Sequence, residues 1–166
     1  GLVTVTGGKL TTFRLLAADA LKAAAPDLPG KQRPRIDEPA FFPVPSPPFD
    51  RRGLSAGMWR RLYGRYGRKA ETIVGGADPR DLKMIPGTHH LWAELPVLAE
   101  TEQVRHLSDL LMRRVRMGLL CPNGGRAHLD RIQRLCEPAL GWDRRRWKTE
   151  RKNYIDYWQY AHGLPE

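Results

Sequence analysis

The sequence is poor in cysteine and has no long apolar run. Its 166 residues include two cysteines, Cys121 and Cys136, and neither belongs to a Cys-x-x-Cys pair or to a Cys and His set at metal-ligand spacing. A disulfide framework is excluded, no metal site is predicted, and we expect inert or buried thiols in a reducing compartment. No apolar stretch approaches the roughly 20 residues of a membrane-spanning helix, and we expect no signal peptide.

Acidic residues are too few to balance the basic ones. The chain has 28 Lys and Arg against 18 Asp and Glu, a formal net charge of +10, and the excess is spread along the chain instead of forming a basic tail. One local patch, residues 143–152, places six basic side chains around Trp147. A solvated helix face with one core tryptophan explains the patch more simply than a phosphate-binding surface, but a basic helical nucleic-acid-binding module remains the alternative for the whole chain.

Strand-forming sequence is scarce. Only residues 2–6 have the β-branched, apolar composition of a strand, and no second convincing strand follows. Because a lone strand cannot pair its own backbone groups, this one should pair between copies or belong to a sheet formed by residues outside this sequence. After Gly7 and Gly8 the hydrophobic period becomes helical, with Thr11 or Thr12 available as a cap, and the helix should end near Pro26.

The rest of the chain is predicted to be helical after a proline-rich connector. Residues 26–53 contain eight of the 14 prolines, which leaves little room for regular structure, so an extended connector anchored by Phe41, Phe42 and Phe49 is expected. Beyond it, apolar periodicity predicts a mainly α fold. The expected helices are at about 55–64, 66–74, 92–114 with an interruption at Pro96, 126–140, and a last helix with Asp143 as its N-cap.

The most informative stretch joins the predicted strand to the first helix: Thr6-Gly7-Gly8-Lys9-Leu10-Thr11-Thr12. Two glycines before a helix leave unpaired N–H groups at its positive end, where an electron-rich group can approach without a Cβ in the way, and Lys9 adds a cation. A P-loop does not fit, because Val3 stands where its first glycine belongs and Leu10 where Ser or Thr should follow the lysine. The spacing leaves a ligand site and a purely structural glycine turn both open.

Other polar and aromatic candidates have simpler structural explanations. His89 and His90 lack a carboxylate or thiol at ligand spacing and are predicted to be an exposed pair in a turn. Asp109 precedes Arg113 by four residues, as in a helix-surface ion pair. The aromatic residues between 142 and 160 are expected in the core and not on a base-stacking platform. The remaining histidines are isolated in the sequence: His106, His128 and His162.

Residues 3–14, with the sequence VTVTGGKLTTFR, resemble the segment with which FAD-dependent glycerol-3-phosphate dehydrogenases leave their flavin domain and enter their C-terminal helical domain. Val115 and Thr101 stand where that family usually has Thr and His. Further stretches resemble the helical domain in the same order: Arg65-Tyr66-Gly67, Pro86-Gly87-Thr88, Ala93-Glu94-Leu95, Glu102, and residues 108–119. The resemblance covers most of residues 1–160.

The resemblance implies a division of the chain into three parts. Residues 1–12 would be the last strand and helix start of an FAD-binding domain, residues 13–53 a helix and the connector, and residues 54–166 the C-terminal helical domain. The implied fold is mainly α, a helical cap domain with one N-terminal strand left over from the FAD-binding domain.

The resemblance also implies an activity for the whole protein: oxidation of sn-glycerol 3-phosphate to dihydroxyacetone phosphate, with electrons passed through FAD to quinone. Gly7, Gly8, Leu10 and Thr11 would lie against the flavin, where negative charge gathers as it is reduced. Lys9 would lie in the active site near the substrate phosphate or the reacting oxygen. The dinucleotide fingerprint and the catalytic base would belong to a preceding part, so residues 1–166 alone should be inactive and hold no FAD.

The expected partners follow from the same resemblance. They are the FAD-binding domain of the same protein, glycerol 3-phosphate and quinone, with no specific nucleic acid, and the whole enzyme would be cytoplasmic and peripheral on the inner face of the cell membrane. Because an unpaired apolar strand is a template for association, residues 1–10 are expected either to self-associate with another copy or to fold back onto the helices.

Overall fold

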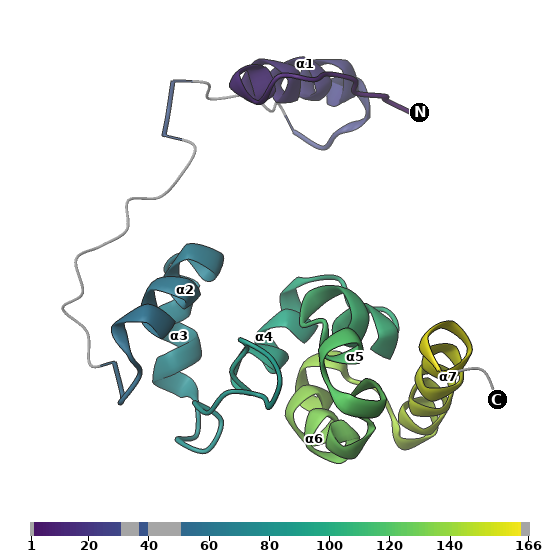
Figure 1. Ribbon diagram of the computed structural model, residues 1–166. Helices are drawn as coiled ribbons and strands as arrows, with labels where there is room; N and C mark the ends of the chain where they lie inside the picture. The colour runs from purple at the N-terminus through teal and green to yellow at the C-terminus, as the bar shows by residue number, and fades with distance from the viewer. Residues whose placement is uncertain (1, 31–36, 40–50, 164–166) are drawn as a thin grey trace. The chain divides into compact units, whose positions relative to one another are not determined.

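The computed structural model describes residues 2–30, 37–39 and 51–163, and the chain divides into two compact units, Gly1–Pro43 and Val44–Glu166 (Figure 1). Within the described ranges the regular structure is helical, and the only β feature is an isolated bridge between Met84 and Leu91. The mainly α fold class is confirmed.

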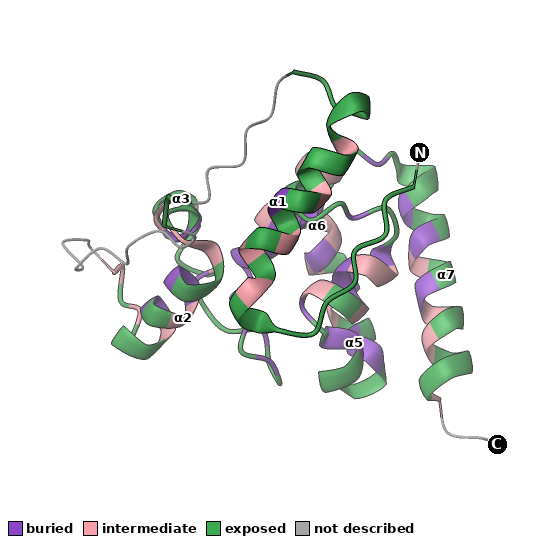
Figure 2. Cartoon of the chain, turned by 90° about the horizontal axis from the view of Figure 1, so that it is seen from above, coloured by how far each residue is buried: buried purple, intermediate pink, exposed green. Residues whose placement is uncertain are grey.

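The N-terminal unit consists of an extended segment and one helix, α1 (Phe13–Ala24), flanked by the short 3-10 helices η1 (Leu10–Thr12) and η2 (Ala25–Asp27). The strand predicted at residues 2–6 is not formed, because no second strand in the described part of the chain pairs with it. Instead the segment runs back beside α1 (Figure 2), and a Cβ at Gly7 would stand 2.5 Å from Leu16 Cδ1.

The boundaries of α1 follow the sequence signals only in part. The hydroxyl of Thr12 does not cap the helix but donates to the carbonyl of Lys9 at 3.1 Å. The end of α1 lies just before Pro26, as predicted, and Pro26 enters η2. Most of the predicted connector at residues 26–53, including Phe41, Phe42 and Phe49, lies outside the described residues.

The C-terminal unit begins with a helical pair, α2 (Ala56–Tyr66) and α3 (Lys69–Gly76), close to the predicted ranges. The Ser55 hydroxyl accepts from the Met58 N–H at 3.2 Å and caps α2, and Gly67 ends it with a positive φ of 55°. The pair encloses one group of buried side chains: Trp59, Leu62, Tyr63, Ala70, Ile73, Val74, Leu82, Leu91 and Ala93.

The predicted helix at 92–114 is two helices, α4 (Glu94–Thr101) and the π-helix η3 (Asp109–Arg114). Pro96 does not interrupt α4, because it lies in the first turn, where N–H groups have no partner within the helix anyway. The break comes after Thr101, where Gln103 takes a positive φ of 50°. The Asp109 carboxylate accepts from the N–H of His106 at 2.9 Å and starts the next helix.

Three further helices complete the C-terminal unit: α5 (Met117–Leu120), α6 (Leu129–Leu140) and α7 (Arg144–His162). The 3-10 segment η4 (Pro122–His128) precedes α6, which therefore starts later than the predicted residue 126. Asp143 caps α7 as predicted, because its Oδ1 accepts from the Arg146 N–H at 2.7 Å.

The main core lies among α4, η3, α5, α6 and α7. Its largest fully buried side chains include Leu98, Leu110, Ile132 and Trp147. The packing is close at Gly124, where a Cβ would lie 2.7 Å from the Trp158 ring at a φ of 64°. Only glycine combines that backbone with that contact. In the part of the chain that the structure describes, no helix has both the length and the apolar content needed to cross a bilayer.

Candidate functional site

The residues predicted to meet a ligand lie together at the start of the N-terminal unit's helix. Lys9 has extended backbone angles and precedes η1, and its carbonyl accepts from the Thr12 N–H at 3.2 Å. The Lys9 side chain is exposed, and no side chain in the described ranges pairs with its ammonium group. The positive charge of Lys9 is therefore available to a ligand.

The two glycines before Lys9 have different surroundings. Gly7 contacts Leu16, whereas a Cβ at Gly8 would meet nothing within 4 Å. The following residues, Leu10 and Thr11, open η1, and the first N–H groups of a helix have no acceptor within it. An open backbone with unpaired donors can receive an electron-rich ligand group. The backbone at Gly8 is thus open just before η1, whereas Gly7 packs against Leu16.

The same unit leaves most of its apolar side chains uncovered. Leu2 is 92% exposed, Leu10 86% and Leu15 56%, and Ala18 is the only buried residue that the structure describes in this unit. Single exposed apolar residues are ordinary, but a group of them around one short helix marks a surface that packs against something else.

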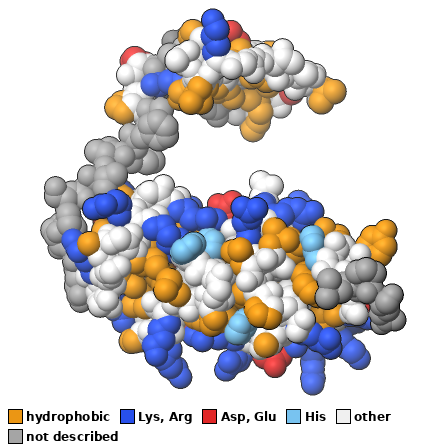
Figure 3. Space-filling view, in the orientation of Figure 1, with side chains coloured by type: hydrophobic (Ala, Val, Ile, Leu, Met, Phe, Trp, Pro, Cys, Tyr) orange, Lys and Arg blue, Asp and Glu red, His pale blue; other side chains and the backbone are white. Residues whose placement is uncertain are grey.

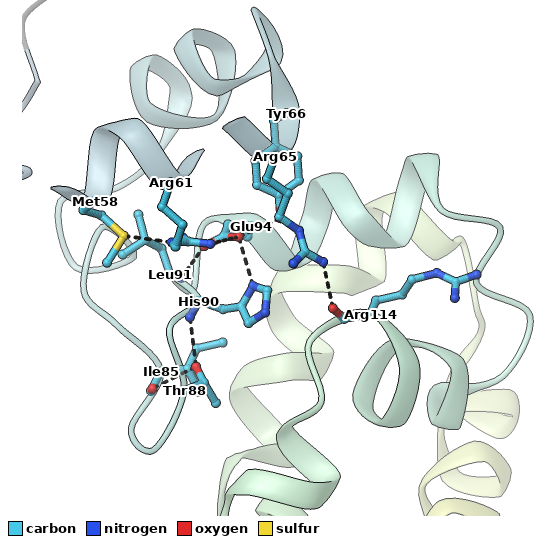
Figure 4. Close-up of polar contacts among 10 residues, drawn as sticks. All are labelled: Met58, Arg61, Arg65, Tyr66, Ile85, Thr88, His90, Leu91, Glu94 and Arg114. Atoms are coloured by element: carbon cyan, nitrogen blue, oxygen red, sulfur yellow. Dashed lines mark hydrogen bonds and ion pairs between the residues drawn. The ribbon is translucent and has the colours of Figure 1, made fainter. Parts of the chain in front are cut away.

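A second set of polar residues surrounds the buried carboxylate of Glu94 in the C-terminal unit (Figure 4). Arg61 of α2 pairs with both carboxylate oxygens, and Tyr66 of the same helix donates to Oε2 at 2.6 Å. His90 Nδ1 lies 3.0 Å from Oε2, and the Leu91 N–H donates to Oε1 at 2.6 Å. An ionised carboxylate can only accept, so Nδ1 carries the ring proton of His90.

These contacts determine the charge state of Glu94. Burial alone would raise its pKa, but the bonds from His90, Arg61, Tyr66 and the Leu91 N–H outweigh burial and lower the pKa to about 2. Burial and the neighbouring Glu94 raise the pKa of the Tyr66 phenol. Glu94 is thus an ionised, fully bonded group that ties α2 to the start of α4, with no lone pair available for proton transfer. Its role is to position residues, not to react.

This cluster was not predicted from the sequence; His89 is exposed, as predicted, but the prediction for His90 is wrong. His90 is not an exposed turn residue: it is buried, with a carboxylate four residues further on. The separation of four residues between His90 and Glu94 was a usable signal, because the turn that leads into α4 brings residues so close in sequence into contact. Arg61 and Tyr66 could not be assigned in that way, because they lie 33 and 28 positions from Glu94.

Two other histidines predicted to be isolated also have partners. His106 Nδ1 lies 3.1 Å from Glu150 Oε1, and the other oxygen of that buried carboxylate accepts from the Leu107 N–H at 2.9 Å. His128 packs edge-on against the Trp92 ring. The ion pair between Asp109 and Arg113 is present at 2.7 Å, as predicted.

The remaining candidates are mainly structural. On α7, Trp147 and Tyr154 are buried, as predicted for core aromatics, but Tyr157 and Tyr160 are exposed, which corrects that prediction for those two. The basic side chains of residues 144–152 therefore surround a tryptophan that cannot stack on a base. Both cysteines are buried and unbonded to each other. Within the described residues no group of three or more His, Cys, Asp or Glu could hold a metal ion.

Comparison with known proteins places these features in a family. Residues 6–147 match the family model described as the C-terminal domain of alpha-glycerophosphate oxidase. No solved structure gives a significant match.

Individual relatives agree with the family match. Glycerol-3-phosphate dehydrogenase 2 of Mycobacterium tuberculosis (strain ATCC 25618 / H37Rv) is 32% identical over 93% of this chain and 29% of its own length. The aerobic glycerol-3-phosphate dehydrogenase of Escherichia coli (strain K12) is 34% identical over 71% of this chain and 26% of its own. The chain thus spans less than a third of these relatives' lengths. It belongs to the family of the C-terminal domain of alpha-glycerophosphate oxidase.

Proposed function

We propose that these residues are the C-terminal part of a flavoenzyme that oxidises sn-glycerol 3-phosphate to dihydroxyacetone phosphate and passes the electrons through FAD to quinone. The observation that supports this most directly is the family match over residues 6–147, joined to relatives named glycerol-3-phosphate dehydrogenase. In this proposal a flavin-binding part of the same protein supplies FAD, and the whole enzyme lies on the inner face of the cell membrane.

The residues around Lys9 would meet the cofactor and the substrate. FAD, when bound, accepts a hydride, and negative charge then gathers at one edge of its ring. The N–H groups of Leu10 and Thr11, beside the open backbone of Gly8, would face that edge and stabilise the charge. The Lys9 ammonium, which is exposed and pairs with no side chain among the described residues, would hold the substrate phosphate or the oxygen at the reacting carbon.

The apolar surface of the N-terminal unit supports this arrangement. Leu2, Leu10 and Leu15 are exposed there, and covering them against a flavin-binding part would hold the Gly7 to Thr11 stretch rigidly at the ring. A site assembled in this way needs both parts. We therefore expect the 166-residue chain alone to be inactive and colourless, and the longer protein to be yellow.

Substitution of Lys9 tests the proposed site in the longer protein. Lys9→Ala should lower the rate of glycerol 3-phosphate-dependent dye reduction, with a loss in kcat/KM equivalent to about 2–4 kcal/mol, because one charge-assisted contact to the substrate disappears. The matched control is Lys22→Ala, which removes an exposed lysine that pairs with Asp19 on the same helix at 3.3 Å. Equal kinetics for Lys9→Ala and the control would remove Lys9 from the site.

A further inference from the structure

A hollow of about 480 Å³ lies on the C-terminal unit between α2 and the segment around α5. Its lining combines basic and apolar residues and comprises Arg61, Gly64, Arg65, His89, His90, Val115, Arg116 and Leu120. Figure 3 shows Lys and Arg side chains gathered along this edge of the unit, with histidine next to them.

The charges of the lining do not balance. Glu94 is bonded to Arg61 and His90 of the lining, and the positive charge of Arg61 balances its negative charge. Arg65 and Arg116 have no carboxylate partner among the residues that the structure describes. The hollow therefore has an excess of two positive charges, equal in magnitude and opposite in sign to the charge of a phosphate monoester dianion.

The cationic groups are held in place before any ligand arrives. Arg65 Nη2 donates to the Arg114 carbonyl at 2.9 Å, and its guanidinium lies 5.6 Å from the centre of the Tyr66 ring. Arg114 is two residues before Arg116 in the sequence, so this bond anchors Arg65 to the backbone segment that carries Arg116. A planar guanidinium with several donors left over binds phosphate oxygens in pairs.

Arg116 and His90 are also constrained. Arg116 is exposed and takes a left-handed backbone conformation with φ 54° and ψ 22°, which a residue other than glycine adopts only when its surroundings require it. His90 also lines the hollow, and its ring is oriented by the bond from Nδ1 to Glu94. The buried Glu94 carboxylate thus positions two side chains that line the hollow, Arg61 and His90.

We propose that this hollow binds the phosphate group of an organic phosphate, with Arg65 and Arg116 as the main contacts and the exposed Leu120 side chain facing the apolar part of the ligand. Binding sites for small molecules combine an apolar wall with a few fixed polar groups in this way. The phosphate can belong to a soluble ester or to the headgroup of an anionic lipid. The proposal does not rest on the dehydrogenase activity, so either can fail without the other.

The test is a binding titration of the 166-residue chain at low ionic strength. Inorganic phosphate and glycerol 3-phosphate are followed by calorimetry and amide NMR shifts, with chloride as the reference anion. Phosphatidylcholine vesicles are compared with vesicles that also contain phosphatidic acid. Arg65→Ala and Arg116→Ala should each weaken binding by about ten- to hundredfold, because each removes a charge-assisted contact.

Arg145→Ala is the matched control, since Arg145 is an exposed arginine on α7 outside the hollow. A soluble ester is supported as the ligand if the soluble phosphates bind saturably, both hollow variants lose that binding, and Arg145→Ala keeps it. Binding confined to phosphatidic acid vesicles, with the same pattern of loss, supports a lipid headgroup. No saturable binding of any probe, or an equal loss in Arg145→Ala, overturns the proposal. Amide spectra of each variant confirm that it is folded.

Discussion

The two units differ in how far their apolar side chains are buried. In the N-terminal unit, Leu2 and Leu10 are 92% and 86% exposed, and the helix α1 buries only Ala18 among the described residues. In the C-terminal unit, Leu62, Leu110 and Ile132 are fully buried within two clusters of side chains. Because most of a helix's stability comes from packing its apolar face, the second unit can hold itself together, whereas the first needs a further surface.

The comparison also separates two kinds of site. The stretch from Gly7 to Thr11 is continuous in sequence and has few contacts of its own, so its geometry depends on what later covers it. The Glu94 cluster is assembled from α2 and α4 and is complete as it stands. The first kind is typical of a site shared between two parts of a protein, and the second of a group that fixes a fold.

The largest expected effect is on the core of the C-terminal unit. Leu110→Ala should lower the free energy of unfolding by about 2–5 kcal/mol, because it empties a fully buried position. Leu15→Ala makes the same chemical change on α1, where the side chain is 56% exposed, and should cost less than about 0.5 kcal/mol. Urea unfolding of the 166-residue chain measures both. Similar losses for the two variants would contradict the contrast between the units.

The next effect concerns the buried carboxylate. Glu94 has a pKa lowered from 4.5 to about 2 in the folded protein, so its contribution to stability is present above pH 4.5 and is lost as the pH falls from 4.5 toward 2. That contribution corresponds to about 3 kcal/mol. Glu94→Gln should therefore be about 3 kcal/mol less stable than the unaltered protein at pH 7, and the difference should shrink toward pH 2.

The control for this prediction is Glu137→Gln, which changes an exposed carboxylate on α6. Its unfolding free energy should follow that of the unaltered protein at every pH. A difference between Glu94→Gln and the unaltered protein that stays constant from pH 7 to pH 2 would show that the ionised carboxylate is not what stabilises the cluster.

A smaller effect is expected on association. The exposed apolar side chains of residues 2–5 should make the 166-residue chain associate weakly at high concentration, and deletion of residues 1–7 should abolish that association. Tyr160→Lys is the control, because it changes a side chain that is 92% exposed in the other unit. Sedimentation velocity over a range of concentrations gives the answer. Association that persists in the deletion variant would assign it to another surface.

Much of the helical framework could be predicted from local signals. Asp143 is a favourable N-cap residue ahead of the apolar Trp147, and this local signal correctly predicted the start of α7. The break between α4 and η3 was not predictable from periodicity, because Leu107, Leu110 and Leu111 keep helical spacing. The break depends on the positive φ of Gln103 and on the Asp109 carboxylate, which accepts from the His106 N–H. Local pattern indicates which residues are helical, but tertiary contacts decide where the helix stops.

The candidate sites show the same limit. The Gly7 to Thr11 stretch was found from the sequence because its residues are adjacent. Arg61 and Glu94 were not joined in advance, because nothing in a sequence pairs residues 33 positions apart. The prediction of a strand at residues 2–6 was wrong because it rested on local composition alone. Its composition favours a strand, but a strand also needs a partner that composition does not supply.

Hydrogen exchange of backbone amides tests the central claim, that the N-terminal unit is completed by a flavin-binding part. The measurement compares the 166-residue chain with the longer protein carrying FAD. The account predicts that amides of α6 are protected in both, whereas amides of α1 exchange rapidly in the shorter chain and slowly in the longer one. Protection of α1 equal to that of α6 in the 166-residue chain alone would contradict it.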